Sequence, residues 1–143
     1  MPLLRPSEQA QALRGIPLFS DLSRSDLEEV AGMSYWVTRD PGLVIIEQGE
    51  IGRDLYLLVE GTARVERDGV VIGDVGKSSV IGEMALIDNY PRSATIFAQT
   101  QCELLAIPHD QFWSFVDRVP SLQRTLLVTL SRRVRDLEQA PTA

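Results

Sequence analysis

The sequence predicts a mainly β domain with helices at both ends, its strands paired antiparallel in a closed barrel or a sandwich. Two observations carry this prediction. Turn-forming residues recur every few positions between residues 36 and 107, and short β-prone runs lie between them. The flanking segments, 1–35 and 108–138, instead repeat apolar residues at helical spacing. The chain of 143 residues has the length of one domain, which we place over residues 1–143.

The N-terminal segment is predicted to be helical. Ser23 is the predicted N-cap of one helix, and Asp26 stands in the capping-box position three residues later. Leu27, Val30 and Ala31 then follow at helical spacing. The apolar run 16–19 before the cap is expected to pack against the core of the domain.

Six runs are predicted to be strands, at residues 43–46, 55–59, 62–67, 70–72, 93–98 and 102–107. The dipeptide Asp68-Gly69 between the third and fourth runs predicts a tight hairpin, because that turn needs positive φ, which both residues tolerate. Many short strands at near-regular spacing favour an antiparallel barrel or sandwich over a parallel sheet.

The C-terminal segment is predicted to hold two helices. A short one opens after Pro108, Pro120 breaks it, and Ser121 is the predicted cap of a longer helix that runs to about Glu138. The spacing leaves open whether the apolar face of this helix packs on the barrel or pairs with a second copy. The residues of that face are spaced three, four and three apart, as in an a/d seam: Leu127, Leu130, Val134 and Leu137.

Composition argues against several classes of protein. A 44% hydrophobic content is too high for a disordered chain, and no apolar run approaches the ~18 residues of a membrane span. No secretion signal is visible, so we expect a cytoplasmic protein without membrane contact. One cysteine, Cys102, cannot form a disulfide framework, and the single His109 argues against a metal centre or a metal-dependent enzyme of the cupin type. We expect no catalytic residues, no catalytic cofactor and no metal.

Residues 80–95 break the pattern of a plain barrel. A strand-like entry meets Gly82, one turn of helix formers follows, and a new strand begins near Arg92. A short helix between strands presents free backbone N–H groups, which bind anions. Arg92 can bind a phosphate through two donors, Ser93 adds a hydroxyl, and Glu83 is an acceptor suited to a sugar hydroxyl. The set fits a phosphorylated sugar, although a simple ion pair between Glu83 and Arg92 remains an alternative.

Two motifs in this chain resemble those of the cyclic nucleotide-binding domain family. Residues 81–86, Ile-Gly-Glu-Met-Ala-Leu, and 91–94, Pro-Arg-Ser-Ala, are similar to its phosphate-binding cassette, which we place at 81–95. Residues 48–61 are similar to a second signature, QGEIGRDLYLLVEG. The resemblance extends over about residues 16–138. It implies a jelly-roll β-barrel with N-terminal helices and a C-terminal lid and dimerisation helix.

The resemblance implies roles for the first half of the cassette. Glu83 would accept a hydrogen bond from the ribose 2′-hydroxyl, with the backbone of Gly82 close against the sugar. Met84 and Ala85 would present their backbone amides to the cyclic phosphate. Ile81 stands where the family often has Phe, which is a mild change in an apolar wall.

The second half of the cassette would hold the phosphate and influence the choice of base. Arg92 would neutralise the phosphate and Ser93 would donate to it. A threonine at the position of Ser93 tends to favour guanine in some branches of the family, so Ser93 favours cAMP over cGMP. Apolar residues near the base and polar residues of the lid helix are further candidates for ligand contact: Val71, Ile72, Val80, Ile81, Thr125 and Thr129.

We therefore expect a non-catalytic sensor that binds a cyclic nucleotide and signals through its C-terminal helix, to a partner protein or within a homodimer. The alternative is a nucleotide-independent scaffold for protein interaction on the same barrel. Related transcription regulators continue into a winged helix-turn-helix, whereas this sequence ends at Ala143, so we expect no direct binding to nucleic acid. The basic run 132–135 is interpreted as a solvated helix face.

Overall fold

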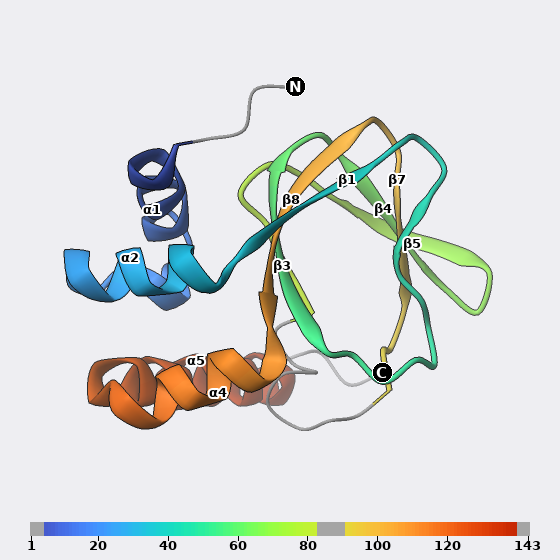
Figure 1. The fold of residues 1–143 in the computed structure, drawn as a ribbon. Helices are drawn as coiled ribbons and strands as arrows, with labels where there is room; N and C mark the ends of the chain where they lie inside the picture. Colours follow the sequence, from blue (N-terminus) through green and yellow to red (C-terminus); the bar gives the residue numbers. More distant parts are fainter. Residues whose placement is uncertain (1–4, 83–90, 140–143) are drawn as a thin grey trace.

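Two four-stranded antiparallel sheets pack face to face in the computed structural model, which describes residues 5–82 and 91–139 (Figure 1). The first sheet has the order β1 (Tyr35–Arg39), β8 (Cys102–Pro108), β3 (Asp54–Glu60) and β6 (Val80–Ile81). The second has the order β2 (Val44–Ile46), β7 (Thr95–Ala98), β4 (Ala63–Arg67) and β5 (Val70–Val75). This order confirms the predicted antiparallel jelly-roll with flanking helices.

The predicted closure into a barrel is wrong in detail. No ladder joins the two sheets within the described part of the chain, so the strands form an open sandwich. The edge strand β6 has only two residues, which is too short to carry a ladder from one sheet to the other.

The six predicted strands are all present, with ends that differ from the prediction by at most three residues. The hairpin between β4 and β5 is also confirmed, because Asp68 and Gly69 have φ angles of 53° and 79°. Strand β1 was not predicted from the sequence. It follows a helix directly at Tyr35, without the turn residues that mark the other strands.

Within the described residues, five helical elements flank the sandwich: α1 (Pro6–Arg14), the 3-10 turn η1 (Pro17–Phe19), α2 (Arg24–Met33), α4 (His109–Arg118) and α5 (Pro120–Gln139). Ser23 caps α2 as predicted, because its hydroxyl accepts from the backbone N–H of Asp26 at 3.1 Å. The prediction that Ser121 caps the last helix is wrong. That helix already begins at Pro120, since proline fits the first turn of a helix. Among the described residues, none of the helices combines the length and the hydropathy that a membrane span requires.

The core has two parts, one on each face of β8. Leu105 and Ile107 point to the helices, where they pack in a cluster with Phe19 and Phe112, whose ring centroids lie 6.4 Å apart. Leu104 points the other way, into the apolar layer between the two sheets. The helices therefore cover only the first sheet, and α4 and α5 lie together beneath one end of the sandwich (Figure 1).

Candidate anion-binding site

Arg92 is buried where the loop before β3 meets the end of β6. Only 7% of the surface of Arg92 is exposed to solvent. Its Nη2 donates to the backbone carbonyl of Asp54 at 2.7 Å, and its Nη1 donates to the carbonyl of Gly82 at 3.2 Å. The backbone is fixed as well, because the Arg92 N–H donates to the carbonyl of Glu50 at 2.7 Å and the Gly49 N–H donates to that of Arg92 at 2.9 Å.

The two carbonyls are available to Arg92 because the β3–β6 ladder stops short. Alternate residues of β3 direct their backbone groups towards β6, as Leu58 does in accepting from the Ser78 N–H at 2.7 Å. Asp54 belongs to the same alternate set, but β6 ends at Ile81 before reaching it. The chain turns at Gly82, with φ of 88°. The guanidinium of Arg92 thus takes the place of a missing strand at the open end of the ladder.

Two glycines make room for the guanidinium. A Cβ atom at Gly52 would lie 2.2 Å from Cζ of Arg92, and one at Gly82 would lie 2.1 Å from its Nη1. Any larger residue at either position requires the guanidinium to move. The positive φ of Gly82 is a second reason for glycine there.

The charge of Arg92 is poorly solvated. Burial lowers its pKa, while the nearby Tyr56, Asp54 and Glu50 act in the opposite direction. No ion pair joins Arg92 to a carboxylate among residues 5–82 and 91–139, although burying an unpaired charge is costly. The two carbonyls engage two of the five N–H donors of a guanidinium. The others have no partner within residues 5–82 and 91–139 and can donate to an anion.

Ser93 is exposed and follows Arg92 directly. Its carbonyl accepts from Nε of Arg67 at 3.1 Å, which ties this segment to the tip of the β4–β5 hairpin. Gln48 fixes the same tip from the other side, since its side chain donates to the Asp68 carboxylate at 2.8 Å and accepts from the Asp68 N–H at 2.9 Å. Ser93 is thus tied to a hairpin tip that Gln48 also holds. Glu83, Met84 and Ala85 lie outside the described residues.

The predicted contacts with the base are spread over different parts of the molecule. Ile81 is buried between the sheets, whereas Val80 packs on the helical side. Val71 and Ile72 lie on the edge strand β5 and are both 49% exposed. The hydroxyls of Thr125 and Thr129 donate to backbone carbonyls one turn earlier in α5: those of Ser121 and Thr125.

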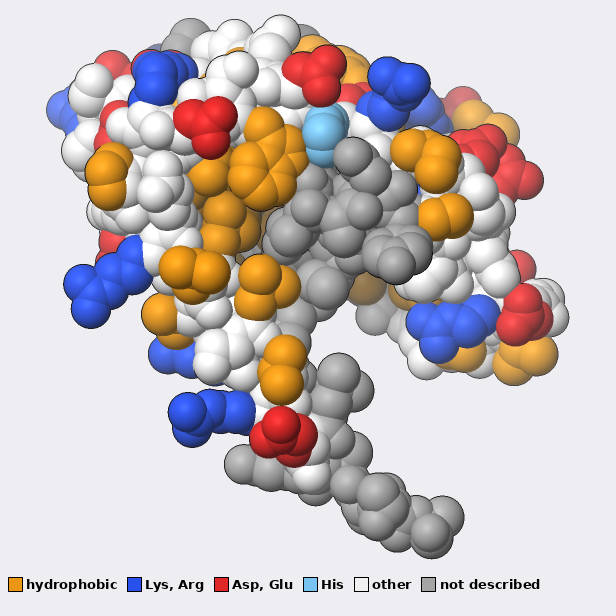
Figure 2. Space-filling model, turned by 90° about the horizontal axis from the view of Figure 1, so that it is seen from below, with side chains coloured by type: hydrophobic (Ala, Val, Ile, Leu, Met, Phe, Trp, Pro, Cys, Tyr) orange, Lys and Arg blue, Asp and Glu red, His pale blue; other side chains and the backbone are white. Residues whose placement is uncertain are grey.

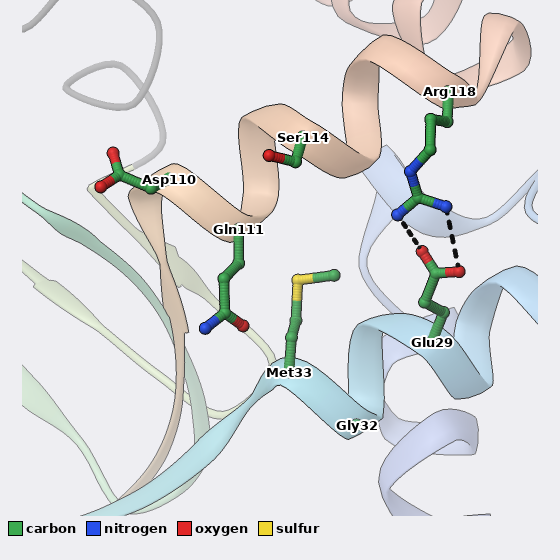
Figure 3. A pocket seen from close by; sticks show the side chains of 7 residues that line it. All are labelled: Glu29, Gly32, Met33, Asp110, Gln111, Ser114 and Arg118. Carbon is green, nitrogen blue, oxygen red and sulfur yellow. Dashed lines mark hydrogen bonds and ion pairs between the residues drawn. The ribbon is translucent and has the colours of Figure 1, made fainter.

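The largest part of the site that sequence reasoning missed is the wall around the guanidinium. Two residues of the upstream motif form this wall: Gly52 lies against Arg92, and Asp54 supplies a carbonyl to it. The glycine spacing in residues 48–61 was the available signal. A separate groove of about 470 Å³ between α2 and α4, bridged by the Arg118–Glu29 pair, shares no residue with this site (Figure 3).

An antiparallel sandwich holds a buried arginine at the open end of a ladder, and within residues 5–82 and 91–139 that arginine forms no ion pair, which fits a small domain that binds an anion. The family model of the cyclic nucleotide-binding domain matches residues 37–119, more than half of the chain. The chain therefore belongs to the cyclic nucleotide-binding domain family. Relatives in it include kinase regulatory subunits, so the family is one of regulatory domains.

Individual proteins agree with this assignment. The chain is 30% identical over 133 residues to the cyclic AMP receptor protein of Thermus thermophilus, with 88% of this chain and 61% of that protein covered. It thus spans about three fifths of that relative. The N-terminal domain of a transcriptional regulator from Streptomyces coelicolor A3(2) superimposes with a TM-score of 0.78 at 32% identity, covering 92% of this chain and 94% of that one. The sensor domain of the regulator DNR from Pseudomonas aeruginosa shares the fold, with a TM-score of 0.83 at 22% identity and 96% of each chain covered.

Proposed function

We propose that this domain is a sensor that binds a cyclic nucleotide, with cAMP preferred over cGMP. The observation that carries the proposal is the buried guanidinium of Arg92, which lacks an ion pair within the described part of the chain and keeps donors for an anion. A cyclic phosphate carries one negative charge and two exocyclic oxygens, which suit such a cation. The likeness to a protein named for cyclic AMP supports the choice of ligand.

The cassette supplies the remaining contacts in this proposal. Ser93 donates its hydroxyl to the phosphate beside Arg92, and the amides of Met84 and Ala85 complete the oxyanion contacts. Gly82 and Glu83 hold the ribose. The preference for adenine depends on Ser93, and Val71, Ile72 and Ile81 are candidates for an apolar wall near the base.

The output of the sensor is proposed to pass through α5. Leu127 and Val134, from the predicted seam, are 68% and 54% exposed, and apolar side chains follow this helix away from the body of the molecule (Figure 2). Water-exposed apolar residues at a/d spacing favour pairing with a second copy. In this proposal the ligand shifts the position of α5, and a homodimer or an unidentified partner protein responds.

Isothermal titration calorimetry of the folded protein with cAMP and with cGMP tests the proposal. We expect binding of both, tighter for cAMP. Arg92→Gln should weaken binding by about thirtyfold or more, because it removes a charged partner from a buried site. Arg64→Gln is the matched control, since Arg64 forms a surface pair with Asp74 at 3.2 Å, and it should bind as the wild type does.

Absence of heat with either nucleotide would contradict the proposal if circular dichroism shows a folded protein. The alternative function, a nucleotide-independent scaffold, rests on the exposed face of α5 alone. It would be favoured by a protein that dimerises through α5 and binds neither nucleotide.

A further inference from the structure

A tyrosine on β1 reaches across a strand to the residue that holds Arg92. The hydroxyl of Tyr35 donates to the carboxylate of Asp54. β8 lies between β1 and β3, and Tyr35 stands opposite Ala106 of β8. The small Ala106 leaves room for the tyrosine to pass over β8 on the side that faces the second sheet.

Asp54 joins the tyrosine to the arginine through two different groups. Its carboxylate accepts from Tyr35, and its backbone carbonyl accepts from Arg92 at 2.7 Å. Asp54 is the first residue of β3 and pairs with Pro108. The His109 N–H donates to the carbonyl of Arg53 at 2.6 Å, so the pair 54/108 is one without ladder hydrogen bonds. Tyr35 therefore restrains a residue whose backbone β8 does not hold.

The carboxylate of Asp54 is also close enough to Arg92 to favour its charged form. Among the described residues it forms no ion pair with Arg92, and it accepts a hydrogen bond from Tyr35. Released from that hydrogen bond, the carboxylate would be an internal anion next to the site. It would then compete with a phosphate for the donors of Arg92 that the carbonyls of Asp54 and Gly82 do not engage.

We propose that Tyr35 is a positioning residue for the anion site: its hydroxyl holds the Asp54 carboxylate away from Arg92 and keeps the Asp54 carbonyl directed at the guanidinium. This inference rests on the proposed function, in that Arg92 is taken to bind the phosphate of the ligand. Burial, together with the bond to Asp54, raises the pKa of Tyr35, so the hydroxyl remains a donor at physiological pH.

A double-mutant cycle on cAMP affinity tests the inference. Tyr35→Phe keeps the ring and removes the hydroxyl, and it should weaken binding about fivefold or more. Asp54→Ala removes the carboxylate, and with it both the competing charge and the acceptor for Tyr35. In the Asp54→Ala background, Tyr35→Phe should change the affinity by less than about twofold. A merely structural role for Tyr35 would give the same loss in both backgrounds, which would overturn the inference.

The control is Thr38→Val on the same strand, because the Thr38 hydroxyl also donates to a carboxylate, that of Glu103 at 2.7 Å, without contact to Arg92. It should leave cAMP affinity unchanged. The NMR signal of the Arg92 Nε–Hε group, recorded without ligand, should shift in Tyr35→Phe and stay in place in Thr38→Val. An unmoved signal would contradict the inference, whereas failure of the wild type to bind either nucleotide would contradict the proposed function alone.

Discussion

Cζ of Arg92 lies 2.2 Å from the position that a Cβ atom at Gly52 would occupy. Gly52 is buried, and its φ angle is not positive, so its backbone conformation does not require glycine. Glycine is required at position 52 because a side chain there would collide with the guanidinium of Arg92. A glycine in one motif and an arginine about forty residues later thus form a single structural unit.

Gly52→Ala should damage the site without destroying the fold. The added methyl group displaces the guanidinium from the carbonyls of Asp54 and Gly82, at a cost to stability of about 1–3 kcal/mol. We expect cAMP affinity to fall at least about tenfold, measured by calorimetry. Gly73→Ala is the control, because a Cβ there meets nothing within 4 Å. Equal affinities of the two variants would show that Gly52 is not needed for Arg92.

Local signals predicted most of the fold. The hairpin at Asp68-Gly69 and the cap at Ser23 depend on residues next to them in the sequence, and both are confirmed. Ser121 was wrongly predicted as a cap because a proline at the start of a helix and a proline that ends the previous one look alike in sequence. Closure into a barrel was wrongly predicted because it depends on the length of edge strands such as β6.

The candidate site was predicted less completely, for a physical reason. Arg92 stands in a recognisable motif, but the groups that hold it come from the ends of β3 and β6. Which carbonyls remain free depends on where the β3–β6 ladder stops, and that is a property of the folded sheet. The contact between Tyr35 and Asp54 is even harder to predict from the sequence, since β8 lies between their strands in the sheet.

Ser23→Ala should destabilise the protein by about 1 kcal/mol, because α2 loses the acceptor for the Asp26 N–H. The free energy of unfolding, from urea denaturation, measures the loss. Ser25→Ala, two positions later in the first turn of the same helix, should change stability by less than about 0.5 kcal/mol. A similar loss in both variants would mean that the cap contributes nothing specific.

Leu127→Asp should shift the protein towards the monomer if α5 pairs with a second copy. Leu127 is 68% exposed, so a charge there costs little in the monomer but disrupts an apolar interface. Sedimentation equilibrium over a range of concentrations measures the change. Arg132→Asp is the control, because at 3.6 residues per turn it lies on the other side of the helix. A wild-type protein that stays monomeric at all concentrations would contradict the dimer.

Glu29→Gln should make the protein less sensitive to acid. Glu29 on α2 accepts from both terminal nitrogens of Arg118 on α4, and this contact lowers the pKa of the carboxyl (Figure 3). A carboxyl whose pKa is lower in the folded than in the unfolded state stabilises the fold above the unfolded pKa. That contribution is lost as the pH falls through the folded value.

The wild type should therefore lose more stability than Glu29→Gln between about pH 5 and pH 3, as measured by the urea midpoint at each pH. The difference should be small, because both side chains are largely exposed. Arg118→Gln breaks the same pair from the other side, so it should flatten the pH dependence to the same degree, and the double variant should add nothing further. If Arg118→Gln keeps the pH dependence of the wild type, the low pKa of Glu29 does not come from Arg118, and the two helices are joined by their apolar contacts alone.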